Sequence, residues 1–193
     1  MLLGDLPGRG PSAARGLEAA HRLGRTDFRN LVVFTSLSKR SNAPGLRSGA
    51  VAGDAALLKA FLLFRTYHGS AMSETIQAAS LAAWEDETHV VENRRRYRAN
   101  FEAVLAELDG VLPARQPDAG FYLWAPVPGG DDLAFTRDVF AAAHVTVLPG
   151  QFLAREARGV QPGRGYIRMA LVADLADCRD AARRIAALCR TQP

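Results

Sequence analysis

Apolar residues near the amino terminus gather in short runs separated by polar and glycine-rich segments. The run at 31–35 is continuous and β-prone, which is typical of a strand buried on both faces. The segment 36–53 is rich in Ser, Gly and Pro and ends in a second short apolar run at 49–52. This pattern predicts a strand, a functional loop and another strand, preceded by a short helix over 16–24.

Side chains that cap helices mark where the next helices should begin. Asp54 is an expected N-cap for a helix that runs to about residue 65. Ser73 opens a long helical region over 73–108, with a break expected near the acidic run at 85–87. That acidic run is interpreted as a solvated helix face rather than an acid–base pair.

The pattern changes after residue 110, where shorter strands and helices are expected. The expected strands are 121–124, 145–148 and 166–172, and the expected helices are 131–143 and 175–190. A small sheet with helices is an α+β arrangement. The sequence therefore predicts a loose lead-in over 1–15, a first domain over 16–100 and a small α+β domain over 101–193.

Composition excludes several classes of protein. Apolar residues make up 48% of the 193 residues and charged residues 23%, as in a soluble globular protein, and no run is long enough to cross a membrane. The net charge is +4, but the densest basic run, 94–96, falls in a predicted helix without a stacking-aromatic module, so no nucleic-acid partner is expected. The histidines lack metal-ligand spacing, so no metal is expected. Cys178 and Cys189 are expected to be core thiols, which favours a cytoplasmic location.

The segment 35–49 holds the side chains with the clearest chemistry. Lys39 follows a predicted buried strand, where desolvation favours the neutral, nucleophilic amine. The hydroxyls of Ser36 and Ser38 precede it, and Arg47 follows just before Gly49. Hydroxyls and a guanidinium that converge on one point suit a phosphate dianion. Composition alone would favour a surface turn with an ordinary lysine.

The order of these residues resembles the class I/II aminotransferases, which have the pyridoxal-phosphate fold type I. Their pattern is Ser-x-Ser-Lys, a short spacer that contains Pro-Gly, and Arg-x-Gly. This sequence reads Ser36-Leu37-Ser38-Lys39 and then Pro44-Gly45-Leu46-Arg47-Ser48-Gly49. The resemblance implies that Lys39 holds pyridoxal 5'-phosphate as a Schiff base and acts as the general base. It also implies that Ser36 and Arg47 bind the cofactor phosphate, with Ser38 a weaker candidate for the same role.

The second half of the chain carries two further segments that resemble the family. The segment 166–171 resembles a late strand whose arginine, here Arg168, clamps the substrate α-carboxylate; a guanidinium fork suits that group. The segment 117–124 resembles the one that lines the substrate mouth. Phe121 and Tyr122 there either touch substrate or belong to the core.

The resemblance implies an α/β fold that is the C-terminal part of a fold type I transferase. It would comprise an incomplete large-domain sheet with helices and a small C-terminal domain. Within the family, the sequence most resembles the N-succinyldiaminopimelate aminotransferases of bacterial lysine biosynthesis. The implied reaction transfers an amino group between N-succinyl-diaminopimelate and 2-oxoglutarate, in an enzyme that is a homodimer at full length.

One departure from the family is large. The family's N-terminal half, with its ring-stacking aromatic and its ring-nitrogen carboxylate, is not recognisable in residues 1–30. We therefore expect a truncated chain with exposed sheet edges. The alternative to an enzyme is a non-catalytic aminotransferase-like fragment or a regulatory or dimerisation module.

Overall fold

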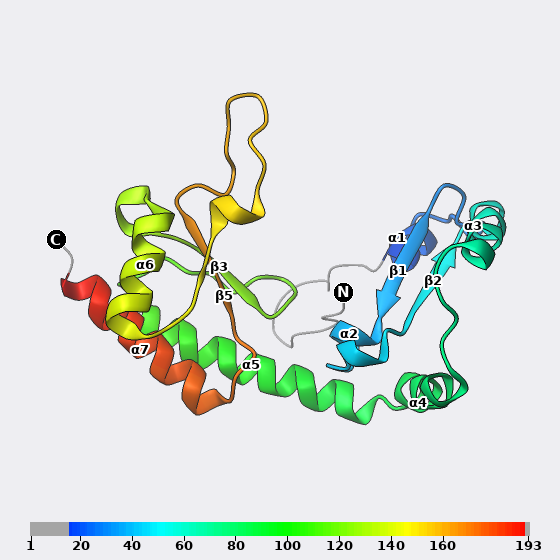
Figure 1. Ribbon diagram of the computed structural model, residues 1–193, viewed down its shortest axis with the longest axis horizontal. Coiled ribbons are helices and arrows are strands. Elements are labelled where there is room, and N and C mark those ends of the chain that lie inside the picture. The colour runs from blue at the N-terminus through cyan, green and yellow to red at the C-terminus, as the bar shows by residue number, and fades with distance from the viewer. Residues whose placement is uncertain (1–15, 192–193) are drawn as a thin grey trace. The chain divides into compact units, whose positions relative to one another are not determined.

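The computed structural model describes residues 16–191 and divides the chain into two compact units (Figure 1). One unit ends at Asn93 and the other begins at Arg94, so the division falls inside helix α5 (Thr88–Leu108). The boundary expected near residue 100 lies in the same helix. The expected lead-in over 1–15 lies outside the described residues.

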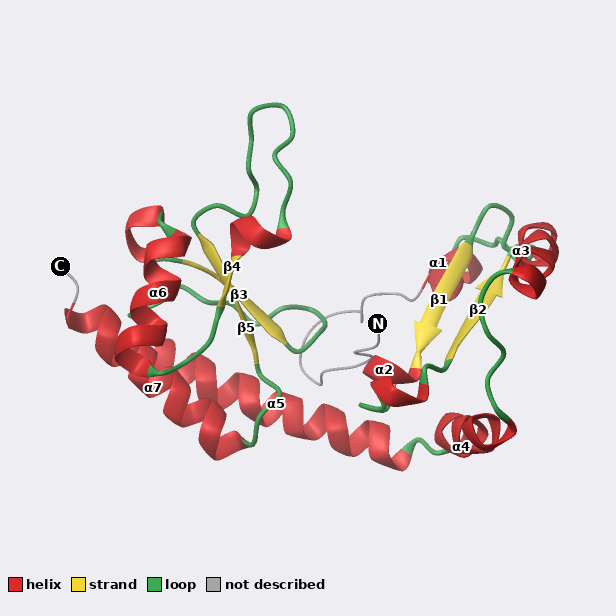
Figure 2. Cartoon of the chain, viewed as in Figure 1, coloured by secondary structure: helices red, strands yellow, loops and turns green. Residues whose placement is uncertain are grey.

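The first unit is built around an antiparallel hairpin. Strand β1 (Val32–Ser36) pairs with β2 (Gly49–Gly53), and Ser36 lies opposite Gly49. Around this pair lie α1 (Gly16–Arg22), α2 (Leu37–Arg40), the 3-10 turn η1 (Pro44–Leu46), α3 (Ala55–Tyr67) and α4 (Glu74–Glu85) (Figure 2). The caps fall where the sequence predicts them, since Asp54 accepts hydrogen bonds from Ala56 N and Leu57 N.

The expectation that the first strand is buried on both faces is wrong. Phe34 of β1 is 66% exposed, and the remaining strand residues are only partly buried. Within residues 16–93 the sheet has only these two strands, and Phe61 of α3 meets Phe34 edge-on at 6.0 Å between ring centroids. A two-stranded sheet cannot cover both of its own faces, which explains the exposure.

The second unit packs helices against one face of a small sheet. In the described part of this unit the strand order is β3 (Tyr122–Pro126), β5 (Tyr166–Ala170), β4 (Leu148–Pro149), and all neighbours are antiparallel. Helices α5, α6 (Asp132–Ala143) and α7 (Leu175–Thr191) supply the apolar side chains that meet this face. Two 3-10 turns, η2 (Pro128–Gly130) and η3 (Gly150–Leu153), complete the unit.

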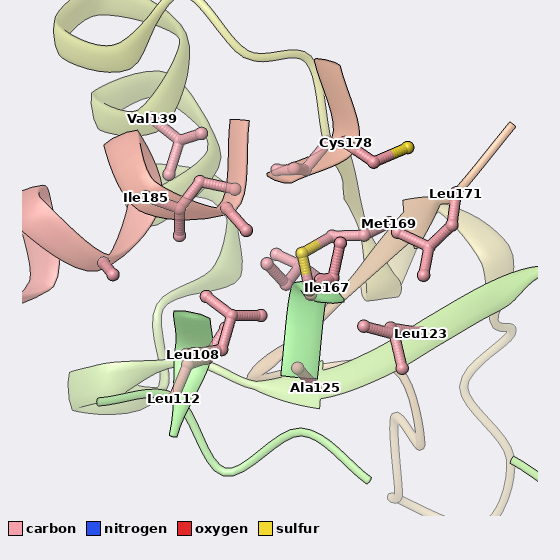
Figure 3. Close-up of a cluster of buried hydrophobic side chains, with 14 of the residues drawn as sticks. Leu108, Leu112, Leu123, Ala125, Val139, Ile167, Met169, Leu171, Cys178 and Ile185 are labelled. Atoms are coloured by element: carbon pink, nitrogen blue, oxygen red, sulfur yellow. The ribbon is translucent and has the colours of Figure 1, made fainter. Parts of the chain in front are cut away.

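The core of this unit follows the period-2 alternation of its strands (Figure 3). Leu123 and Ala125 of β3 and Ile167 and Met169 of β5 point into one apolar cluster, whereas their neighbours face away. The strand expected over 145–148 is shorter than predicted, because only Leu148 and Pro149 pair with β5.

Candidate active site

The turn that leaves β1 places two serine hydroxyls in contact. Ser36 is the N-cap of α2, and its Oγ accepts a hydrogen bond from Ser38 N at 3.1 Å. The same Oγ lies 2.9 Å from Ser38 Oγ and 3.1 Å from the carbonyl oxygen of Ser48. The cap begins the helix with a residue that also presents a hydroxyl to the loop.

Lys39 lies in the last turn of this short helix. Its flanking residues Leu37 and Arg40 are buried at 0% and 7% exposure, whereas Lys39 itself is exposed. The expectation that the lysine is buried is therefore wrong within the described residues. Phe34 of the strand that precedes it is exposed as well.

Arg47 returns the chain to the same end of the hairpin. It has a left-handed backbone (φ 50°) after η1, and its Nη1 donates to Pro44 O at 2.8 Å. Gly49 follows opposite Ser36, where an added Cβ would lie 2.7 Å from Thr35 O, so the two strands approach closely only with glycine here. Ser36 and Arg47 are thus brought to one end of the hairpin, next to the helix that carries Lys39.

A buried arginine that the sequence analysis did not single out lies beside the lysine. Arg40 Nη1 donates to Ala83 O at 2.6 Å, and Nη2 donates to Trp84 O and Asp86 O, each at 3.3 Å. Nη2 also pairs with the Glu87 carboxylate.

The acidic run at 85–87 was the one feature of the sequence that could have indicated a buried cationic partner such as Arg40. Its interpretation as a helix face is wrong, because Asp86 and Glu87 lie between α4 and α5. Asp86 instead caps α5 by accepting from Thr88 N at 2.9 Å. Its hydrogen bond with His89 holds the pKa of the Asp86 carboxyl well below its usual range.

Arg168 belongs to the other unit and faces away from its core. Its guanidinium carbon lies 4.4 Å from the ring centroid of Tyr122, and its strand position is opposite Trp124. Tyr122 is half-buried, while Phe121 is buried and packs its ring 4.3 Å from that of Tyr122. Of the two aromatic candidates for substrate contact, Phe121 is therefore a core residue and Tyr122 shares a face with Arg168.

The rest of the described chain offers no competing metal site. No group of three His, Cys, Asp or Glu side chains that could hold a metal ion occurs among residues 16–191. None of the helices in this part of the chain combines the length and the hydropathy needed to cross a membrane.

These observations first define a class of protein. The α/β architecture is that of the C-terminal part of a fold type I transferase, with an incomplete first sheet and a small second domain. In the first unit the turn that follows β1 carries Lys39 and two serine hydroxyls in contact, and Arg47 lies two residues before Gly49, the strand partner of Ser36. Such a donor set suits a phosphorylated aldehyde.

Comparison with known proteins shows the family. Residues 10–185 match the model "Aminotransferase class I and II", and the chain belongs to this family. It is 59% identical to an aminotransferase of solved structure from Neisseria meningitidis Z2491, with a TM-score of 0.85, over 89% of this chain and 44% of that one. Members of the family depend on pyridoxal phosphate.

Two other relatives carry names of diaminopimelate enzymes. An LL-diaminopimelate aminotransferase from Nitratidesulfovibrio vulgaris is 33% identical over 161 residues, which cover 81% of this chain and 40% of the relative. A structure of a probable N-succinyldiaminopimelate aminotransferase from Thermus thermophilus is 30% identical, with a TM-score of 0.70, over 84% of this chain and 43% of that one. The chain thus spans less than half the length of the relatives that it matches.

Proposed function

We propose that the protein binds pyridoxal 5'-phosphate at Lys39 and provides the lysine-bearing part of an aminotransferase. The observation that supports this most directly is the turn after β1. There Ser36 and Ser38 are in hydroxyl contact, Lys39 follows in α2, and Arg47 returns beside Gly49, the strand partner of Ser36. Family membership supports the same assignment.

The residues present fit the group in their donor chemistry. The hydroxyls of Ser36 and Ser38 and the guanidinium of Arg47 would hold the phosphate, because charge-assisted hydrogen bonds to phosphate oxygens are strong. The amine of Lys39 would carry the cofactor. Bound pyridoxal phosphate supplies an aldehyde carbon and an electron-accepting ring.

Lys39 would also act on the substrate. Its Nζ would be the general base that takes the proton from the substrate Cα. Arg168 would bind the substrate carboxylate, since its planar fork matches that group and the ring of Tyr122 lies beneath its guanidinium.

A diaminopimelate derivative is the proposed substrate. The family acts on amino and 2-oxo acids, and the names of two relatives, one LL-diaminopimelate and one N-succinyldiaminopimelate aminotransferase, support a long dicarboxylic amino acid. The proposed reaction moves an amino group between N-succinyl-diaminopimelate and 2-oxoglutarate, as part of lysine biosynthesis. A homodimer in the cytoplasm belongs to the same proposal, and the free thiols Cys178 and Cys189 fit a reducing compartment.

The sequence makes the cofactor test simple. Lys39 and Lys59 are its only lysines. After incubation with pyridoxal phosphate and reduction with borohydride, peptide mass spectrometry should find the adduct mainly on Lys39, and absorbance near the visible edge should be lost in Lys39→Ala. Equal labelling of Lys39 and the exposed Lys59 would contradict the proposal. Half-reaction with glutamate or N-succinyl-diaminopimelate then tests transamination.

A second candidate is a non-catalytic aminotransferase-like module. The specific observation in its favour is that Lys39 is exposed, whereas Schiff-base chemistry is favoured by a desolvated amine. A module of this kind would bind pyridoxal phosphate or a second copy of the chain without exchanging amino groups. Selective labelling of Lys39 with no spectral change on addition of any amino acid would favour this candidate.

A further inference from the structure

A charged side chain is buried directly beside the proposed cofactor lysine. Arg40 follows Lys39 in α2, and its side chain is only 6% exposed. Burial of a guanidinium is costly unless its donors are satisfied. Here they are satisfied by one short stretch of chain, 83–87, and by Ser41 Oγ at 3.3 Å.

The carbonyls that Arg40 meets are those that a helix end leaves without partners. Helix α4 ends at Glu85, so Ala83 O and Trp84 O belong to its last turn, where intrahelical hydrogen bonds run out. A cation at the C-terminal end of a helix is also favoured by the helix dipole. The Trp84 ring, 5.2 Å from the guanidinium carbon, adds a cation–π contact.

The anchoring face of α2 differs from the face that bears the amine. Leu37 and Arg40 are three residues apart and therefore lie on the same side of the helix, and both are buried. Lys39 is about 100° round the helix from Arg40 and is exposed. A helix of this length has little stability of its own, so its position depends on these two anchors and on the Ser36 cap.

We propose that Arg40 is a positioning residue for Lys39. By tying α2 to the end of α4 it fixes the point from which the lysine amine extends. The inference rests on the proposed cofactor role of Lys39. According to this proposal, the segment 83–87, which is remote in sequence from Lys39, also affects the reactivity of the Lys39 amine.

Arg40→Gln tests this in the full chain because it keeps an amide donor but removes the charge and the fork. The first readout needs no cofactor. Hydrogen exchange should quicken roughly tenfold at the Ser41 and Ala43 amides, which both donate to Leu37 O, because the hydrogen bonds made by the charged guanidinium are lost. Amides of α7 serve as the reference and should exchange as before.

The second readout is the rate at which Lys39 reacts with pyridoxal phosphate, trapped by borohydride and expressed relative to Lys59. In Arg40→Gln this ratio should fall roughly tenfold. Millimolar guanidinium chloride should restore much of it and sodium chloride should not. A general loss of stability would also quicken exchange at the α7 amides, whereas a positioning role changes the amides next to α2 and the Lys39 ratio alone.

The outcomes separate the inference from the proposed function. The inference would be overturned if a folded Arg40→Gln kept the native exchange rates at Ser41 and Ala43. It would also be overturned if the unaltered chain preferred Lys39 and Arg40→Gln kept the same labelling ratio. Faster exchange with no preference for Lys39 in the unaltered chain would uphold the anchoring and contradict the cofactor role. If Arg40→Gln does not fold, Glu87→Ala decides, since Glu87 is largely exposed. That variant should lower the labelling ratio roughly two- to threefold, and an unchanged ratio would refute the proposal.

Discussion

Asp132 illustrates how a single buried carboxylate can hold a loop of the second unit. It is 0% exposed at the start of α6 and accepts hydrogen bonds from Gln151 N at 3.0 Å, Gln151 Nε2 at 2.9 Å and Gly165 N at 3.1 Å. Burial raises the pKa of this carboxyl, but the hydrogen bonds outweigh burial and the pKa lies below its ordinary value of 3.8. One side chain therefore fixes both ends of the segment 151–165, which leads into the strand that carries Arg168.

Replacing this carboxylate should be costly. Asp132→Ala leaves the N–H groups of Gln151 and Gly165 without their acceptor, so the free energy of unfolding should fall by about 3 kcal/mol. Urea denaturation followed by circular dichroism measures the loss. Asp109→Ala, at an exposed position, is the matched control and should change the stability by less than about 0.5 kcal/mol.

The same carboxylate predicts a pH dependence. A carboxyl whose pKa is lower in the folded than in the unfolded chain contributes stability above its unfolded pKa. That contribution is lost as the pH falls below 3.8 through the folded value. The urea midpoint should therefore drop as the pH is lowered below about 4. The drop should be smaller in Asp132→Asn than in the unaltered chain. A drop of the same size in both would show that other groups cause it.

At the scale of elements, α7 closes the core of the second unit. Its inward positions Cys178, Ala182, Ile185 and Ala186 are buried in the cluster, in which burial raises the pKa of the Cys178 thiol. Arg184 donates from the outer side to Ala143 O, the last residue of α6, at 2.6 Å. The helix thus joins the sheet core to the end of its neighbour.

Truncation of an inward residue of α7 should destabilise this unit. Ile185→Ala removes a side chain that is 2% exposed, so the free energy of unfolding should fall by about 3 kcal/mol. Leu175→Ala, at a position that is 46% exposed on the same helix, provides the control. Equal losses for the two variants in thermal or urea unfolding would contradict the packing described here.

The elements show which parts of the fold a sequence can reveal. Asp54 predicted the start of α3, because an N-cap acts on amides two and three residues away. Burial was harder, and the exposed Phe34 shows why: its surroundings depend on segments distant in sequence. Arg40 escaped notice for the same reason, since its acceptors lie more than forty residues further along the chain.

At the scale of the whole molecule, the first unit exposes a large apolar surface. Phe34 on β1 and several side chains of α3 are more than half exposed: Leu62 70%, Leu63 64%, Phe64 55% and Tyr67 79%. Exposed apolar surface of this extent is unusual in a monomeric soluble domain and favours association.

The isolated chain should therefore self-associate as its concentration rises. Leu62→Glu together with Leu63→Glu should lower the apparent mass in light scattering, because charged side chains oppose burial of this surface. Phe140→Glu, at an exposed position of the second unit, tests whether any apolar-to-charged change has the same effect. A chain that stays monomeric at all concentrations would refute this prediction.

The central claim is that Ser36, Lys39 and Arg47 act on one phosphorylated aldehyde. The most direct measurement compares pyridoxal phosphate with pyridoxal, which lacks the phosphate, in borohydride labelling of the two lysines. Lys39 should prefer pyridoxal phosphate more strongly than Lys59 does, and Arg47→Gln and Ser36→Ala should each reduce that preference toward the value for Lys59. Identical preferences at Lys39 and Lys59 in the unaltered chain would contradict the account.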